Sequence, residues 1–452
     1  MPVRLQLGEV CEKAPTEPEV HPTVGKWLIG AGIKAFGFDS FGWRIAPAVA
    51  GIFTVLLMYL IARKLFGSWI WATLAAGLLA FDPLHFVQSR ISMLDIFIPL
   101  FGPAAILFTL LDRDRILEAE DAGSWPQRRL TGRPWRIAAG VAGGLALATK
   151  WTGGFYLALA IILAFAWEVA ARRGAPKAFG RALRQEWLSF AVWMVVLPLA
   201  VYTASYIGQI HGPIFTPWQE GSWVREFLGH HRYMWNFHIG LDATHSYQSP
   251  PWSWILIKRP VSYYFCSGGS CNPPIAEGDY SEIFAVGNPI VWWTSLLAIL
   301  GLAAVWLRRR NYRSPEGLIL AGVLFTYGPW LVPGADRNAV FIFYLLPTLP
   351  FMILALVYWM YRIRASWEGR IAAALFSVGA VAVFFFYLPL LTKQEIPQPQ
   401  WQKRIWVFDN CDKPPGVAVT TIVTVTEDGK VKESPSEFKD NSSLPPTGFC
   451  WI

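Results

Sequence analysis

The sequence predicts an all-α protein that crosses a membrane many times, and three observations support this fold class. Of the 452 residues, 54% are apolar and only 15% are charged, whereas soluble domains carry about 25% charged residues. Apolar runs recur along the whole chain, most of them long enough for a transmembrane helix. The basic residues behind the net charge of +8 gather between these runs. The composition therefore excludes an ordinary soluble enzyme, a disordered chain and a coiled coil, and no nucleic acid is expected as a partner.

About ten apolar segments are predicted to span the membrane as helices. They cover residues 45–62, 69–82, 93–111, 135–149, 151–170, 188–208, 289–307, 317–334, 341–361 and 370–391. The second and the fourth are shorter than the roughly 17–25 residues that span a bilayer, so their limits are approximate. No internal repeat is evident among the segments, which argues against a transporter built from inverted repeats.

The basic residues predict how these segments are oriented. They cluster on every second connection, in residues 63–64, 113–136, 172–184, 308–313 and 362–370. Because short cytoplasmic loops are enriched in Lys and Arg, we place these connections in the cytoplasm and the protein in the plasma membrane.

The domain plan follows from this orientation. Two membrane regions, 45–208 and 289–391, alternate with a first outer loop at 1–44, a large outer loop at 209–288 and an outer tail at 392–452. All seven histidines fall on the outer side, which favours polar chemistry there, although apolar spans also exclude histidine simply because it is polar. The chain starts on the outer side without a signal peptide, so we expect a further helix upstream.

The cysteines and the tail also belong to the outer side. Disulfides are expected between Cys266 and Cys271 and between Cys411 and Cys450, with Cys11 left over; five unpaired thiols are the alternative. No metal site is expected, because no Cys or His pair has zinc-finger spacing. Residues 417–425 are rich in Val and Thr and precede a Glu-Asp-Gly turn, so we expect a β-hairpin in the tail.

Polar residues suited to chemistry lie in four stretches of the outer side. The first runs from His21 to Trp27 and continues at Arg44, where Lys and Trp also fit a simple membrane anchor. In the second, Asp95 opens an apolar helix and needs a cationic partner, for which we expect Arg90. This pair fits a structural ion pair as well as a site.

Two further stretches add cations and aromatic side chains. Lys150 lies in a tight outer turn, where it either extends to the membrane surface or contacts a ligand. The richest stretch, residues 206–260, includes His245, Trp252 and Arg259. Basic groups there suit phosphate and aromatic faces suit sugar rings, although an interfacial aromatic belt also explains many of the Trp residues. The residues thus favour an enzyme that acts on a phosphorylated, lipid-borne substrate.

A family resemblance rests on the order of several short motifs. These are His-Pro-Thr-Val-Gly-Lys-Trp from His21, Trp43-Arg44, Phe81-Asp82-Pro83, Arg90-Ile-Ser-Met-Leu-Asp95, Thr149-Lys150-Trp151-Thr152-Gly153, His245-Ser-Tyr with Ser249-Pro-Pro-Trp-Ser-Trp254, Arg259-Pro260, Gly287-Asn288-Pro289 with Trp292-Trp293, and Arg337 before Phe343-Tyr344-Leu-Leu-Pro347. Over residues 20–410 the chain resembles bacterial protein O-mannosyltransferases, and the loop between Cys266 and Cys271 is similar to the actinobacterial branch.

The resemblance implies a GT-C glycosyltransferase fold whose first family helix is missing from this chain. It implies transfer of mannose from polyprenyl-phosphate mannose to Ser or Thr hydroxyls of secreted or membrane proteins, met at the outer face during translocation. The family inverts the anomeric configuration. A carboxylate base therefore takes the hydroxyl proton, and cationic groups hold the departing phosphate. No cofactor is implied, and the need for a divalent cation stays open.

Within this family, charge and position in the sequence select the candidate site residues. The family carries an Asp-Glu pair upstream of the His-Pro motif, and residues 1–44 contain none, so the catalytic base is not assigned; Asp95 is one candidate. Phosphate-binding candidates are Arg44, Arg90, Lys150, Arg259 and Arg337. Candidates for the sugar or acceptor pocket are Asp95, His245 and Trp252.

Three alternatives to a protein mannosyltransferase remain open from the sequence. The acceptor is a lipid or a cell-wall glycan in the first, and the chain is a catalytically inactive homologue in the second. The third is a transporter of lipid-linked sugars, which would place ionisable residues deep within the spans. Few such residues are predicted there, and this favours an enzyme.

Overall fold

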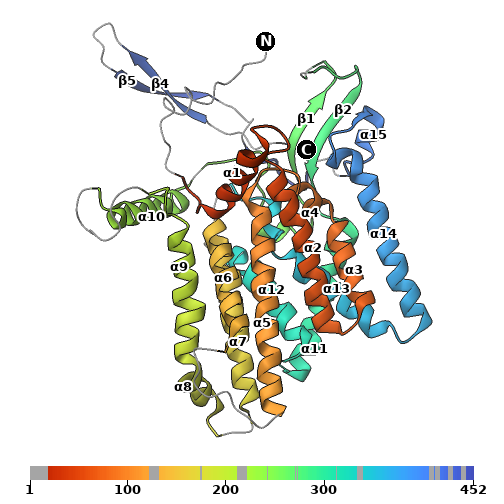
Figure 1. Cartoon of the computed structure of the whole chain (residues 1–452). Coiled ribbons are helices and arrows are strands. Elements are labelled where there is room, and N and C mark those ends of the chain that lie inside the picture. Colours follow the sequence, from red (N-terminus) through yellow and green to blue (C-terminus); the bar gives the residue numbers. More distant parts are fainter. Residues whose placement is uncertain are drawn as a thin grey trace.

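The structure, a computed structural model, is a bundle of long helices with strands and short helices gathered at one end (Figure 1). It describes residues 19–121, 132–173, 176–210, 221–241, 243–269, 271, 273–311, 313–332, 339–406, 412, 418–425, 431–438 and 444–451. Among these residues, six helices are long and apolar enough to cross a membrane. The short apolar helices α3 and α13 extend the bundle.

Every predicted span contains a helix. The bundle consists of α2 (Ile45–Phe66), α3 (Trp69–Ala80), α5 (Phe97–Asp121), α6 (Pro134–Thr149), α7 (Gly154–Ala171), α8 (Ala178–Phe190), α9 (Leu197–Ala204), α11 (Pro289–Arg309), α12 (Pro315–Tyr327), α13 (Leu349–Ile363) and α14 (Trp367–Leu391). A π-helical turn, Ala191–Val196, joins α8 to α9 into one continuous helix, Ala178–Ala204, which begins ten residues before the predicted span at 188–208. Helix existence is thus confirmed, and the number of crossings stays a prediction.

Small residues let the helices of the bundle approach closely. A side chain added at Gly102 of α5 would lie 2.4 Å from the ring of Tyr156 in α7, and one added at Gly322 of α12 would lie 2.2 Å from Phe351 in α13. Since lipid supplies no hydrophobic drive between helices, such close contacts are a main source of cohesion.

Further elements lie at the end of the bundle shown uppermost in Figure 1, and the sequence did not predict most of them. They include α1 (Val24–Phe36), in the stretch that we interpreted as a site or a simple membrane anchor, and the short α4 (Pro83–Gln88). Within the predicted large outer loop lies α10 (Trp223–Ile239), followed by the strands β1 (Val261–Ser267) and β2 (Asp279–Ala285).

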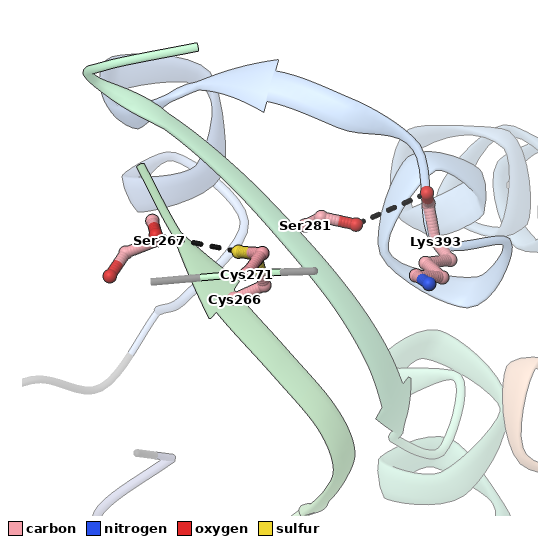
Figure 2. Close-up of a disulfide and its surroundings, with 5 residues drawn as sticks. All are labelled: Cys266, Ser267, Cys271, Ser281 and Lys393. Atoms are coloured by element: carbon pink, nitrogen blue, oxygen red, sulfur yellow. Dashed lines mark hydrogen bonds between the residues drawn. A yellow bond between two sulfur atoms is a disulfide. The ribbon is translucent and has the colours of Figure 1, made fainter. Parts of the chain in front are cut away.

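The strands form a small antiparallel sheet beside the bundle. Val261 pairs with Ala285 across β1 and β2, and Tyr280 pairs with Ile396 of β3 (Glu395–Pro397), which follows α14 and precedes α15 (Gln398–Gln402). Figure 2 shows the Ser281 hydroxyl donating to the Lys393 carbonyl, which ties β2 to the end of α14. Segments more than a hundred residues apart thus build one surface.

The cysteine predictions are confirmed where the structure describes them. Cys266 and Cys271 form a disulfide at the end of β1, with Cα atoms 5.8 Å apart (Figure 2). Cys450 is disulfide-bonded, and its predicted partner Cys411 lies outside the described residues, as does Cys11. The tail contains the predicted hairpin, in which β4 (Ala418–Val425) pairs with β5 (Val431–Phe438).

Three of the basic residues used to orient the chain are not loop charges. Arg133, Arg136 and Arg172 are buried at one end of α5, α6, α7 and α8. They form ion pairs with the buried carboxylates Asp112, Glu168 and Glu186, at 2.7 Å for Arg136 to Glu168 and to Glu186. These arginines therefore hold helices together, which the charge pattern alone did not reveal.

Candidate active site

The best-defined feature of the site is a buried ion pair. Asp95 lies in a 3₁₀ turn (Leu94–Ile96) that leads into α5, and Lys150 lies directly after α6. The Lys150 ammonium donates to Asp95 Oδ1 at 3.0 Å, and the two residues are 8% and 4% exposed. The expected pairing of Asp95 with Arg90 is therefore wrong. A lysine 55 positions further along the chain takes that place.

Aromatic side chains surround this pair. The Lys150 ammonium lies 4.2 Å from the centroid of the Tyr344 ring, close enough for a cation–π contact. A cavity of about 10 Å³ adjoins Asp95, Lys150 and Tyr344, which is room for one water molecule. On the β1 side, desolvation raises the pKa of Tyr263 well above its ordinary value, and the Asp95 charge adds to the shift. Thr152 and Trp330 also line the cavity.

Arg259 is a second buried cation, and unlike Lys150 it has no carboxylate partner among the described residues. It follows the Trp252–Trp254 motif and is only 5% exposed. Its guanidinium donates to the Ser246 carbonyl at 3.1 Å and to the Cys450 carbonyl at 3.3 Å, and it lies 4.7 Å from the Tyr247 ring centroid. Burial lowers the pKa of Arg259, and the Tyr247 hydroxyl partly offsets this. Within the described residues its partners are neutral acceptors, so its charge is left for an anion.

The C-terminal residues hold the segment that carries Arg259. The Cys450 amide donates to the Lys258 carbonyl at 3.2 Å, and the Trp451 indole donates to the Ile257 carbonyl at 2.8 Å. Trp451 is 1% exposed. Ile257 has φ of +57°, which is a strained conformation for a β-branched residue and needs support from its surroundings.

His245 and Trp252 lie near Arg259 but differ in exposure. His245 Nδ1 accepts from the Tyr247 amide at 3.1 Å, and its ring contacts Phe341. Partial desolvation lowers the pKa of His245, and the charge of Arg259 lowers it further. Trp252 is 55% exposed, with the Lys258 ammonium 5.5 Å from its ring centroid. Its exposed face suits a sugar or a peptide.

Arg44 and Arg90 form a third group of cations. Arg44 immediately precedes α2, and Arg90 follows α4 with its guanidinium 5.0 Å from the Phe86 ring centroid. Partial desolvation lowers the pKa of Arg90, and the like charge of Arg44 lowers it further. The Ser92 hydroxyl donates to the Trp43 carbonyl at 2.6 Å and so joins the two segments. Two adjacent like charges favour an anionic ligand.

One segment joins the Lys150 and Arg259 groups. The Ser249 amide donates to the Val340 carbonyl at 3.0 Å, Phe341 contacts His245, and Tyr344 contacts both Lys150 and Trp254. A further contact involves α4. Gln88, two residues before Arg90, donates to the Tyr263 hydroxyl at 2.6 Å. Tyr344 lies in a motif quoted above and was overlooked there, whereas no sequence signal marked Tyr263 or Gln88.

Other matched motifs have a structural role. Asp82 is fully buried; its carboxylate caps α4 and accepts from the Trp292 indole at 2.9 Å and from the Asn288 amide at 3.3 Å. Phe81-Asp82-Pro83 and Gly287-Asn288-Pro289 thus meet to fix α4 against α11. Predicted site residue Arg337 lies outside the described residues. Among the described residues, no cluster of three His, Cys, Asp or Glu side chains is placed to hold a metal ion.

Comparison with known proteins decides the family. The family model of dolichyl-phosphate-mannose-protein mannosyltransferase matches residues 19–211, and that of the C-terminal four-helix region of protein-O-mannosyltransferase matches residues 223–409. The chain belongs to the protein mannosyltransferase family. A polyprenol-phosphate-mannose–protein mannosyltransferase of Mycolicibacterium smegmatis is 30% identical over 434 residues, which cover 86% of this chain and 81% of that protein.

Further relatives of this protein mannosyltransferase agree with that assignment. The polyprenol-phosphate-mannose–protein mannosyltransferase of Mycobacterium tuberculosis is also 30% identical, over 86% of this chain and 80% of its own length. The solved Saccharomyces cerevisiae Pmt1–Pmt2 complex, bound to its sugar donor, shares the fold with a TM-score of 0.67 at 15% identity, over 86% of each chain. The GT-C fold that the motif order implied is confirmed, and the missing first family helix stays a prediction.

Proposed function

We propose that this enzyme transfers mannose from polyprenyl-phosphate mannose to Ser or Thr hydroxyls of proteins, with inversion at the sugar. The names of the mycobacterial relatives support the donor and the protein acceptor. The observation that carries the proposal is that the buried Arg259, without a carboxylate partner among the described residues, is joined through residues 340–344 to the Asp95–Lys150 pair.

The proposed reaction is a single displacement. The bond between the anomeric carbon and the phosphate oxygen breaks, and its electron pair leaves with the lipid phosphate. The acceptor hydroxyl oxygen bonds to the anomeric carbon and loses its proton to a base. Arg259, Arg44 and Arg90 hold the phosphate as its charge grows. Asp95 is our candidate for the base, with Lys150 fixing its orientation.

We further propose that the site faces the outer side of the plasma membrane. Among the described residues, the end of the bundle opposite the site carries two groups of arginines. Arg308 and Arg309 lie in the last turn of α11 and are followed by Arg310 and Arg313, and Arg362 lies in the last turn of α13 and is followed by Arg364. Such clusters are typical of cytoplasmic loops. The acceptors would then be proteins met during or after translocation.

A transfer assay tests the proposed function. Membranes that contain the chain receive radiolabelled polyprenyl-phosphate mannose and a Thr/Pro-rich peptide, beside membranes with Asp95→Asn. We expect label in the peptide with the unaltered chain and a loss of about 100-fold or more with Asp95→Asn, the usual range for a general base. Label in a lipid or glycan fraction instead would favour the alternative acceptor class.

A further inference from the structure

An open apolar groove lies between α3 and α14, away from the candidate site. Its volume is about 1040 Å³, which slightly exceeds the roughly 300–1,000 Å³ of pockets that hold drug-sized ligands. The α3 wall runs from Ile70 to Phe81, and the α14 wall runs from Arg370 to Val381. Figure 1 shows the two helices on the same flank of the bundle.

The length of the groove matches one leaflet of a bilayer. Each wall covers eleven helical steps, and at 1.5 Å per residue this amounts to about 16 Å. The hydrocarbon core of a bilayer is about 30 Å thick, so one leaflet contributes about 15 Å. An extended acyl chain from one leaflet would therefore reach along the whole groove, whereas a helix that spans the membrane would be twice as long.

Three aromatic rings pack together at one end of the groove. The Phe81 ring lies 5.3 Å from Phe384 and 6.0 Å from Phe385, centroid to centroid, where α3 ends against α14. An occupant must therefore enter with its apolar end towards Phe81. Its polar end then lies at the opposite mouth, where both walls begin.

The open mouth carries two arginines. Arg364 and Arg370 line it, and neither is ion-paired within the described part of the chain. The Arg364 guanidinium stacks 3.5 Å from the Tyr361 ring centroid, and Tyr361 packs against Trp71 of the groove wall. Glu368, the nearest acid along α14, does not line the groove. Both helices begin at this mouth, and Figure 1 shows their first turns at the end of α3 and α14 that points away from α4 and β1.

We infer that the groove binds an anionic phospholipid from the leaflet opposite the candidate site. The phosphate of the lipid pairs with Arg364 and Arg370, and one acyl chain extends along α3 and α14 to Phe81. Two arginines near an anionic headgroup each favour it by about fivefold over a neutral one. The site is distinct from that proposed for the polyprenyl-phosphate donor, which lies at the other end.

Photo-crosslinking in nanodiscs tests this inference. The full chain is reconstituted in phosphatidylcholine with a trace of phosphatidylglycerol that carries a photoreactive acyl chain, and adducts are mapped by mass spectrometry. We expect adducts in residues 69–81 and 364–381. Unlabelled phosphatidylglycerol should compete at a concentration at least fivefold lower than added phosphatidylcholine. Equal competition by the two lipids would show ordinary boundary lipid and overturn the inference.

Variants separate charge from shape. In Arg364→Gln/Arg370→Gln the preference for phosphatidylglycerol should fall to within twofold, while Arg308→Gln/Arg310→Gln, which removes the same charge from α11 at the same end, should retain it. Ala374→Phe should abolish the adducts by filling the groove with both arginines present. A preference that survives Arg364→Gln/Arg370→Gln, or a polyprenyl phosphate that competes better than phosphatidylglycerol, would refute the phospholipid assignment.

Discussion

Lys150 and Arg259 differ in what neutralises them, and this sets what each can do. Asp95 pairs with Lys150 at 3.0 Å, so the pair is balanced before any substrate arrives. Arg259 is also buried, but among the described residues it contacts only carbonyls, the sulfur of Cys450 and the Tyr247 ring. A buried cation without a counterion favours binding of an anion. We therefore expect Arg259 to act on the phosphate directly and Lys150 to act through Asp95.

Arg259→Gln should weaken use of the donor. A hydrogen bond to a charged group contributes about 1.5–3 kcal/mol, so kcat/KM for the lipid donor should fall by about 10- to 100-fold. The kcat/KM of Arg259→Lys should lie between that of the unaltered chain and that of Arg259→Gln, because lysine keeps the charge but loses the planar contact with Tyr247. Steady-state kinetics with varied donor measure this. Unchanged donor kinetics in Arg259→Gln would remove Arg259 from the site.

Single residues also show where sequence reasoning stopped. The motifs pointed to Asp95, Lys150 and Arg259, because charged residues beside apolar spans are conspicuous. The partner of Asp95 was chosen from its sequence neighbours, and Arg90 was wrong. The true partner, Lys150, lies at the end of another helix. Spacing along the chain does not tell how close residues of two helices lie in space. Tyr263 was missed for the same reason. It belongs to β1 (Val261–Ser267), and its contact with Gln88 of α4 joins residues that are far apart in the sequence.

At the scale of elements, the end of the chain supports the segment that carries Arg259. Trp451 and Cys450 bond to the carbonyls of Ile257 and Lys258, immediately before Arg259. Ile257 holds a left-handed backbone conformation that a β-branched residue rarely adopts. The C-terminal contact therefore stabilises a strained turn, and the position of the guanidinium depends on it.

Trp451→Phe should loosen that turn. It keeps most of the buried ring and removes the indole donor, so we expect a several-fold rise in donor KM and little change in acceptor KM. Trp293→Phe is a matched control, because its indole donates to the neighbouring Leu256 carbonyl at 3.3 Å from a half-exposed position. If both variants change the donor KM equally, the effect is not specific to the C-terminal contact.

The small sheet contains a pH-sensitive group. Glu282 of β2 is fully buried and accepts from the Trp401 indole at 2.8 Å; burial raises its pKa to about 6 from 4.5. The folded state thus binds a proton that the unfolded state releases, and stability falls as pH rises from about 4.5 to 6. Glu282→Gln should remove this loss and stabilise the protein by about 2 kcal/mol at pH 7.5 but not at pH 4.

Thermal unfolding of both proteins in detergent at a series of pH values measures that difference. The Tm of the unaltered chain should fall relative to Glu282→Gln as pH rises through the window. Parallel curves would mean that the carboxyl of Glu282 has an ordinary pKa in the folded protein.

Elements differ in how well the sequence predicted them. Long spans follow from apolar composition alone, so every predicted span contains a helix, although several helix ends differ from the predicted limits. In contrast, α10 mixes His, Arg and aromatic residues and has no apolar run. The strand β2 pairs with β1 and also with β3, which lies more than a hundred residues further along the chain. Such pairing depends on the finished bundle, and no local pattern reveals it.

At the scale of the whole molecule, ion pairs buried between α5, α6, α7 and α8 anchor the end opposite the candidate site. Arg136 is 1% exposed and contacts Asp112, Glu168 and Glu186 from three other helices. Removal of one member leaves carboxylates buried without a counterion, which is costly. The network therefore links the helices that also present Asp95 and Lys150 at their other ends.

Arg136→Met should destabilise the bundle by about 3–5 kcal/mol. The exposed pair between Lys64 and Asp114 is the matched control, and Lys64→Gln should cost less than about 1 kcal/mol. Equilibrium unfolding in mixed micelles measures both. A cost for Arg136→Met no larger than that of the control would show that the network does not anchor the helices.

The most direct test of the whole account uses the purified chain in liposomes with polyprenyl-phosphate mannose and a Thr-containing peptide. Mass spectrometry of the peptide reports a hexose on the hydroxyl. We predict one added hexose with the unaltered chain and none above background with Arg44→Gln/Arg90→Gln/Arg259→Gln, provided that this variant keeps the Tm of the unaltered chain. Equal modification by the two proteins would contradict the claim that these cations hold the lipid phosphate.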